Sequence, residues 1–463
     1  MRARPTRPVN PAPQASGCRT SVGATQTGLY DGLMIVRGHS LLAAILLYAG
    51  IAGISRAYPT GILSFDELAK APVIATCIVQ ETSRDPTPAS PGNRVISAHA
   101  TLLVLRTFPE LIVGARASER IQLDYEALPE GDLGMNGPDV PNLSRGVTLV
   151  LPLKINPKPS SGDWRLIADE GGALVIPAIP RKPPFSQSPR NGREFLLYEI
   201  ASVLISGTRT EVFAEVSYVS GQKTIASELT QLLEPKLGAD EDRWALIAAS
   251  LLSSMGVPRA TITELRSGKD TVAGDFSGSF ITALLQRLGE SARARELLIH
   301  GLLINSDIAA WGAGITLREF AQDPSLIREL RTMLELRRAG SLSVARDILS
   351  AGQKEIFGDA TSLALHYIST PGTSPSELQP ACWVIRDFGT DEQFSRFISE
   401  IRKSQDRDRH HYDELWRNTI WSDSKRERAV LEILLADHRM FTANQRYSDI
   451  ARYELARIQT GKR

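Results

Sequence analysis

The sequence contains few cysteines, which excludes a disulfide-stabilised scaffold. There are three in 463 residues, and Cys18 lies in an N-terminal stretch rich in proline and arginine. Cys77 and Cys382 lie far apart, in segments of different hydrophobic pattern. An oxidising compartment would allow these two to pair, but a single cysteine in a strand or helix more often behaves as a small buried apolar side chain. We therefore predict two buried, unpaired thiols.

An excess of charge of one sign is also missing. The 53 Lys and Arg residues nearly balance the 52 Asp and Glu residues, so the composition predicts no nucleic acid and no anionic membrane surface as a partner. The hydrophobic fraction of 42% is ordinary for a globular protein. The length leaves room for two or three domains.

Motifs for cofactors and hydrolases are absent or incomplete. The segment SGKDT at 267–271 has the Gly-Lys pair of a phosphate loop, but Thr263 replaces its first glycine and Asp270 replaces its magnesium-binding hydroxyl. The GAG at 312–314 lies in a helical pattern, so helix packing explains it better than a dinucleotide-binding turn. There is no Gly-x-Ser-x-Gly and no His-Glu-x-x-His. Motifs therefore predict no cofactor and no catalytic residue.

Histidine is scarce, with seven residues in all. His410 and His411 lie among acidic residues in DRDRHHYDE, but adjacent residues point to different sides of a helix and no third ligand is marked. We predict a solvated charged face there, and no metal site. His99, His300 and His366 are expected at the surface or at helix caps.

The longest apolar run indicates export from the cytoplasm. It extends from Leu41 to Ile54, about 14 residues, which is short of the roughly 20 needed to span a membrane and suits a signal peptide. Arg37 precedes the run. Ser55-Arg56-Ala57 follows it and places small residues, Ser55 and Ala57, at the two positions that signal peptidase recognises. We predict cleavage between Ala57 and Tyr58. The alternative is an uncleaved anchor, which would be the only membrane contact.

The 33 residues before Met34 have no apolar period and are rich in proline, arginine and small polar residues. A signal peptide normally begins a few residues before its apolar core. We therefore interpret 1–33 as a misassigned start, with translation beginning at Met34. The alternative is a disordered cytoplasmic tail on an anchored protein.

The segment 58–180 has the pattern of a small β-domain. Five apolar or alternating runs, rich in valine, isoleucine, leucine and threonine, are separated by clusters of proline, glycine, asparagine and serine. In the second run Ile96, Ala98 and Ala100 alternate with polar residues, including His99. This alternation predicts a strand with one face in a closed or two-layered core.

The order of ELAKAPVIATCIVQE, ATLLVLRTFPE, GVTLVLPLK and the expected hairpin WRLIADEGGALVIP resembles an OB-like, TIMP/netrin-type barrel found near the N-terminus of uncharacterised exported bacterial proteins. The resemblance covers about a quarter of the chain. It implies a bacterial, periplasmic or secreted location. TIMP-like inhibitors bind a protease metal through an N-terminal cysteine, whereas this mature chain would begin at Tyr58, so the resemblance does not carry over that inhibitory residue.

A Pro/Ser/basic stretch at 181–192 is typical of a linker. The hydrophobic period changes from Arg193 onward, the segment TEVFAEVSYVS is ambiguous, and helical spacing dominates from Thr224. Asp323-Pro324 is a helix start, and Thr390 with Gln393 predicts a capping box. Successive helices joined this closely form antiparallel hairpins, and the segments 307–334 and 378–401 resemble HEAT-like repeats. Pro380 and the GAG at 312–314 are expected to interrupt helices, so an irregular α-helical domain is the alternative.

The fold class predicted is therefore multidomain α+β, with a small N-terminal β-barrel followed by an all-α helical-hairpin domain. The predicted segments are a leader at 1–33, a signal peptide at 34–57, a barrel domain at 58–180, a linker at 181–192 and a HEAT-like domain at 193–463.

Three functions are compatible with this organisation. The first is a non-catalytic scaffold of the cell envelope, whose helical array binds a protein or peptide. The second is an envelope hydrolase with a site between the barrel and the helical domain, using the acidic turn residues Asp124, Glu126, Glu130 or Asp132. The third is a structural envelope component.

Overall fold

The computed structural model describes most of the chain beyond residue 64. The described residues are 65–85, 96–110, 118–127, 143–157, 163–167, 175–219, 225–255, 262–266, 276–420, 425–442 and 444–460. The expected leader and signal peptide, the cleavage site at Ala57 and Tyr58, the segment 267–271, and the residues Cys18, Glu130 and Asp132 lie outside them.

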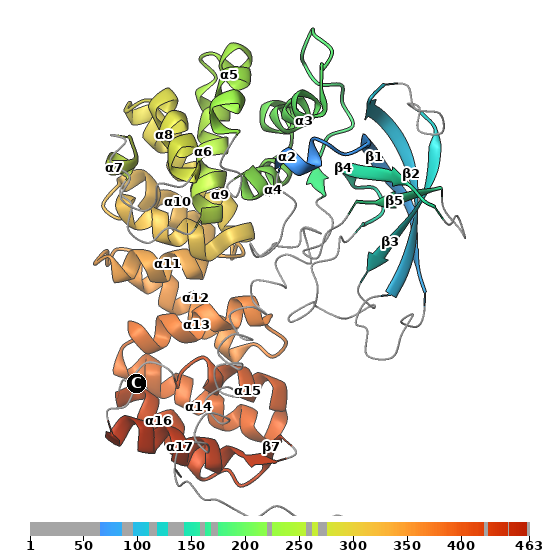
Figure 1. The fold of residues 1–463 in the computed structure, drawn as a ribbon. Helices are drawn as coiled ribbons and strands as arrows, with labels where there is room; N and C mark the ends of the chain where they lie inside the picture. Colours follow the sequence, from blue (N-terminus) through green and yellow to red (C-terminus); the bar gives the residue numbers. More distant parts are fainter. Residues whose placement is uncertain are drawn as a thin grey trace, which may run out of the picture. The chain divides into compact units, whose positions relative to one another are not determined.

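Five strands form a closed barrel (Figure 1), which confirms the predicted β-domain. The strands are β1 Val73–Arg84, β2 Ile96–Phe108, β3 Arg120–Ala127, β4 Thr148–Ile155 and β5 Trp164–Leu166. Their order is β1-β2-β3-β5-β4, and an antiparallel pairing of β1 with β4 closes the sheet. Only the β3–β5 pair is parallel among the described strand pairs. The closed five-stranded arrangement is OB-like.

The expected hairpin at 164–177 is wrong. This run divides into β5 and a short strand, β6 Ile176–Pro177, which do not pair with each other among the described residues. Both instead pair with β4, β5 opposite Leu153–Ile155 and β6 opposite Leu149 and Val150. Because β1 occupies one edge of β4, the two short strands share its other edge.

Strand alternation fills the barrel. On β2 the side chains of Ile96, Ala98, Ala100, Leu102 and Val104 are buried, whereas the residues between them are exposed or half-buried. They meet inward side chains from the other strands in one apolar cluster. The outer face is polar where the second half of β1, the first half of β2 and β3 lie side by side, with exposed or half-buried side chains such as Glu81, Ser97, His99, Gln122 and Asp124.

The other described elements are helical, apart from β6 and a short β7–β8 hairpin near the C-terminal end (Figure 1). The elements are α2 Phe65–Leu68, α3 Gly192–Ser206, α4 Arg209–Val219, α5 Ala226–Leu237, α6 Glu241–Met255, α7 Ile262–Arg266, α8 Phe276–Leu288, α9 Ala292–Leu317, η1 Arg318–Phe320, α10 Pro324–Glu335, α11 Ser341–Ser350, α12 Phe357–Ser369, α13 Pro375–Asp387, α14 Asp391–Arg407, α15 Arg409–Arg417, α16 Lys425–Leu435, β7 Met440–Thr442, β8 Gln445–Arg446 and α17 Tyr447–Thr460.

The helices stack in two rows, as helical hairpins in series do. In one row α4 packs on α6, α6 on α9, α9 on α11, α11 on α13 and α13 on α15. In the other row α10 packs on α12, α12 on α14 and α14 on α16. This stacking confirms the HEAT-like arrangement.

The predicted helix starts are confirmed. The Asp323 side chain accepts a hydrogen bond from the Ser325 amide, with Pro324 at the first helical position of α10. Thr390 and Gln393 form a complete capping box at the start of α14. The Thr390 cap fixes the tight turn between α13 and α14.

The expected helix breaks are wrong, because GAG and Pro380 lie inside α9 and α13. Gly314 is needed for packing: a Cβ atom there would lie 2.3 Å from Asp347 Oδ2 on α11. The helix-packing interpretation of GAG is therefore confirmed. A local deviation in α9 occurs instead at Ala309, whose φ of −139° and ψ of 58° are not helical.

Within the described ranges, the helical stretch Ala292–Phe320 is the one long and apolar enough to cross a membrane by length and composition. In its most apolar window 61% is buried inside the protein. This apolarity serves the interior of the array, because α9 packs against both α6 and α11.

Candidate functional site

Asp124, one of the acidic residues predicted for a hydrolase, lies on the outer face of the barrel beside His99. His99 Nδ1 lies 2.8 Å from Asp124 Oδ1. Since a carboxylate only accepts hydrogen bonds, the imidazole is the donor. Asn156 Nδ2 donates to the other oxygen, Asp124 Oδ2, at 2.8 Å. Two strands and the end of β4 thus fix the orientation of one half-buried histidine.

The opposite nitrogen of this imidazole faces β1. His99 Nε2 lies 3.8 Å from Oδ1 of Asp85, which follows the last residue of β1. The His99 side chain is 31% exposed and that of Asp124 is 18% exposed. Glu126, another predicted candidate, is exposed on β3 opposite Ser97 and lies one row away.

The predicted solvated face at 406–414 is correct for His410 and wrong for His411. His410 is exposed, whereas His411 is buried and its Nε2 donates to the Ile368 carbonyl at 2.9 Å. The two residues diverge by one helical step, so one faces solvent and the other the core. Asp408 caps α15 by accepting from the His411 amide.

The other expected surface histidines lie on the helices. His300 is exposed and bonded to Glu329, and His366 is exposed with its Nε2 2.8 Å from Arg337 Nη1. No group of three or more His, Cys, Asp or Glu residues in the described part of the chain could hold a metal ion.

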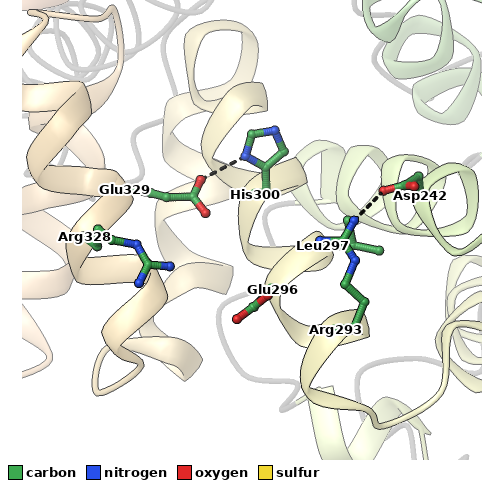
Figure 2. A pocket seen from close by; sticks show the side chains of 7 residues that line it. All are labelled: Asp242, Arg293, Glu296, Leu297, His300, Arg328 and Glu329. Carbon is green, nitrogen blue, oxygen red and sulfur yellow. Dashed lines mark hydrogen bonds and ion pairs between the residues drawn. The ribbon is translucent and has the colours of Figure 1, made fainter.

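A pocket of about 320 Å³ lies on the helical array (Figure 2). Its lining comes from α6, α9 and α10 and consists of Asp242, Arg293, Glu296, Leu297, His300, Arg328 and Glu329. Charged groups of both signs therefore surround a single aliphatic side chain.

Two interactions hold part of this lining (Figure 2). Arg293 Nη2 donates to Asp242 Oδ1 at 3.4 Å, and His300 Nδ1 lies 2.9 Å from Glu329 Oε2. Both pairs are exposed enough for water to weaken them. Glu296 and Arg328 are exposed and form no ion pair with another described residue. The pocket thus offers one acidic and one basic group for an incoming ligand.

A third cluster of ionisable groups is buried where β2 meets α3. Arg106 Nε and Nη2 donate to the two carboxylate oxygens of Glu199, both at 2.7 Å. Arg106 also donates to the carbonyl oxygens of Ile179 and Pro180, at 2.8 and 3.2 Å. One guanidinium therefore binds the barrel strand, the segment after β6 and the first long helix together.

Glu215 on α4 extends this cluster without a partner. Its side chain is fully buried, and neither carboxyl oxygen has a hydrogen bond within the described residues. Burial raises the pKa of Glu215 well above its ordinary value, and the negative charge of Glu199 raises it further. Burial also raises the pKa of Glu199, but the hydrogen bonds from Arg106 oppose that shift. The two carboxyls thus differ: the hydrogen bonds from Arg106 favour the charged form of Glu199 against the effect of burial, whereas Glu215 has no such partner and its neutral form is favoured.

This buried cluster has the perturbed groups of an active site, but its carboxyl groups are not exposed. Glu199 is 1% exposed and Glu215 is 0% exposed. No substrate reaches such atoms in the folded protein. The cluster is therefore a structural connection, and the accessible chemistry lies on the barrel face and in the helical pocket.

Both described cysteines are free and buried, as predicted. Burial raises the pKa of the Cys77 thiol to about 12, and it also raises the pKa of Cys382. The nucleophilic thiolate form is therefore disfavoured at both positions.

Comparisons with known proteins find no family model, no curated protein and no solved structure that matches this chain. The fold and the sites described above are thus the grounds for a functional conclusion.

Proposed function

We propose that this protein is an exported bacterial module of the cell envelope that binds a protein or peptide through its helical array. The apolar run before Ala57 supports export. Stacked helical hairpins present long continuous surfaces, and proteins of this architecture commonly use such surfaces for binding. The array itself acts as a scaffold in this proposal and performs no chemistry.

The observation that carries the proposal is the pocket at α6, α9 and α10. Leu297 offers an apolar contact, while Arg328 and Glu296 offer charges of opposite sign. A partner segment with neighbouring acidic and basic side chains would pair with both residues. Such complementarity contributes to specificity and association rate more than to raw affinity.

Site-specific crosslinking in cells tests this proposal. A photo-reactive amino acid replaces Leu297 in the pocket, and a control replaces Arg402, an exposed residue of α14. We expect a discrete crosslinked partner from position 297 and none from position 402. Mass spectrometry of the product identifies the partner, and N-terminal sequencing of the purified protein tests for Tyr58 as the mature end.

A charge reversal separates specific binding from chance contact. Arg328→Glu should abolish the crosslink from position 297, whereas Arg396→Glu on the exposed face of α14 should leave it unchanged. A crosslink that survives Arg328→Glu, or equal crosslinking from both probe positions, would contradict the proposed use of the pocket.

A further inference from the structure

We propose that the outer face of the barrel carries an acyl-transfer site in which Ser83 is the nucleophile, His99 the base and Asp124 its positioning residue. This inference goes beyond binding by the helical array. It also differs from a hydrolase site between the barrel and the helices, because all three residues lie on strands β1, β2 and β3.

Strand register places the three residues in one row. Ser83 on β1 lies directly opposite His99 on β2, and His99 lies directly opposite Asp124 on β3. Both pairings are antiparallel. Residues directly opposite each other project from the same face of a sheet, with Cβ atoms about 4.5–5.5 Å apart. A serine, a histidine and an aspartate are therefore consecutive neighbours across three strands.

The imidazole is oriented as this chemistry requires. Asp124 binds Nδ1, and Asn156 holds Asp124 in turn. Nε2 consequently faces β1, as its 3.8 Å distance from Asp85 shows. Asp85 is two residues beyond Ser83, so the two side chains project from the same side of the chain. The nitrogen that would accept a proton thus faces the strand that carries the serine.

The row is accessible to a substrate. Ser83 is exposed, and His99 is 31% exposed. This contrasts with Glu199 and Glu215, which are sealed in the core. The carboxylates of Asp85 and of the exposed Glu81 and Glu126 lie near the Ser83 and His99 part of the row, whereas the exposed Arg165 on β5 lies opposite Asp124 at its other end. The charges nearest Ser83 are acidic and disfavour anionic substrates there, so the site would take neutral or cationic esters.

The reaction proceeds in two balanced steps. Ser83 Oγ attacks the acyl carbon of the ester as its proton moves to His99 Nε2, and the alcohol leaves with that proton, so that an acyl-serine remains. A water molecule then attacks the acyl-serine, giving up a proton to His99. Ser83 regains a proton as the carboxylic acid departs. Asp124 stabilises the imidazolium in both steps without itself becoming protonated.

The test uses the purified full chain, a fluorophosphonate probe that reacts with activated serines, and p-nitrophenyl acetate as a neutral ester. We expect stoichiometric labelling of Ser83, identified by peptide mass spectrometry, and slow turnover of the ester. Ser83→Ala should abolish both. The matched control is Ser97→Ala, an exposed serine in the next row opposite Glu126, which should change neither.

The role of the partners has its own readouts. His99→Gln should slow labelling about 10²- to 10⁴-fold, as expected for loss of a general base. Asp124→Asn should lower kcat for the ester while leaving KM unchanged, because Asp124 orients the base and does not contact the ester. Circular dichroism and the unfolding midpoint verify that each variant is folded.

Several results would overturn the assignment. These are a folded wild-type protein that the probe does not label, labelling at another serine, labelling that persists at full rate in His99→Gln, or equal losses in Ser97→Ala and Ser83→Ala. The outcome is separable from partner binding, since Ser83→Ala should leave the crosslink from position 297 intact.

Discussion

Replacing Glu215 by methionine should stabilise the protein, although the residue is fully buried. The native carboxyl has no hydrogen-bond partner among the described residues, so folding removes two polar oxygens from water without compensation. Methionine has a similar length, no group that needs a partner, and a flexible side chain that adapts to the available space. Arg106 and Glu199 retain their hydrogen bonds in this variant.

The expected gain combines a constant part and a part that depends on pH. Burying a polar group without a hydrogen bond costs about 1–3 kcal/mol, and the methionine variant avoids this cost at any pH. In addition, the unfolded chain releases the Glu215 proton above its ordinary pKa of 4.5, whereas the folded chain retains it because burial raises the pKa. Stability of the wild type therefore falls as pH rises, by about 1.4 kcal/mol per unit while the folded protein keeps the proton.

The assay is urea unfolding followed by tryptophan fluorescence at pH values from 5 to 8. The unfolding free energies of wild type and Glu215→Met are compared at each pH. The comparison requires that the two proteins have equal m-values. The variant should be the more stable protein throughout, with a difference that grows toward pH 8. Glu432→Met, at an exposed position of α16, is the control and should stay within about 0.5 kcal/mol of wild type at every pH.

Two results would refute the reasoning about Glu215. If Glu215→Met were less stable than wild type at pH 5 and at pH 8, the carboxyl would have a compensating interaction in the folded protein. If the difference were the same at both values, the buried group would not retain its proton, and the shift of its pKa would be wrong.

Three further changes test the packing around the sites. Arg106→Met should destabilise the protein by about 3–5 kcal/mol, because Glu199 is left buried as an unpaired charge; adding Glu199→Leu should recover most of the loss in urea unfolding. Gly314→Ala should cost about 1–3 kcal/mol through its clash with α11, whereas Gly358→Ala, which has open space around it, should stabilise by about 0.4–1 kcal/mol in the same assay. Thr390→Ala should lower the unfolding free energy by about 0.5–2 kcal/mol, since it removes the cap of α14, and a change below 0.2 kcal/mol would contradict that role.

Local patterns predicted the two-part architecture well. Alternation such as that from Ile96 to Ala100 depends only on which face of a strand is buried, and helix caps such as Thr390 depend on neighbours within one turn. The run at 164–177 failed because alternation does not say which strand becomes the partner. Once β1 occupied one edge of β4, both short strands had to use the other.

The ionisable clusters were harder to foresee. Glu199 and Glu215 stand in helices that are buried on nearly every side, so the hydrophobic period does not indicate a buried face that would contain them. The contact between Glu199 and Arg106 is not predictable either, because it joins segments distant in sequence. The row from Ser83 to Asp124 likewise depends on the register of two strand pairs, which a one-residue slip would move to the opposite face.

The closed barrel also restricts how anything can attach to it. In an open sheet, a partner can extend the hydrogen-bond ladder with its own main chain, whatever its side chains are. Here the pairing of β1 with β4 consumes those donors and acceptors along the closure. Any molecule that binds this part of the barrel must recognise the side chains on its outer surface. Selectivity there depends on the chemistry of those side chains and not on whether the partner can form an extended strand.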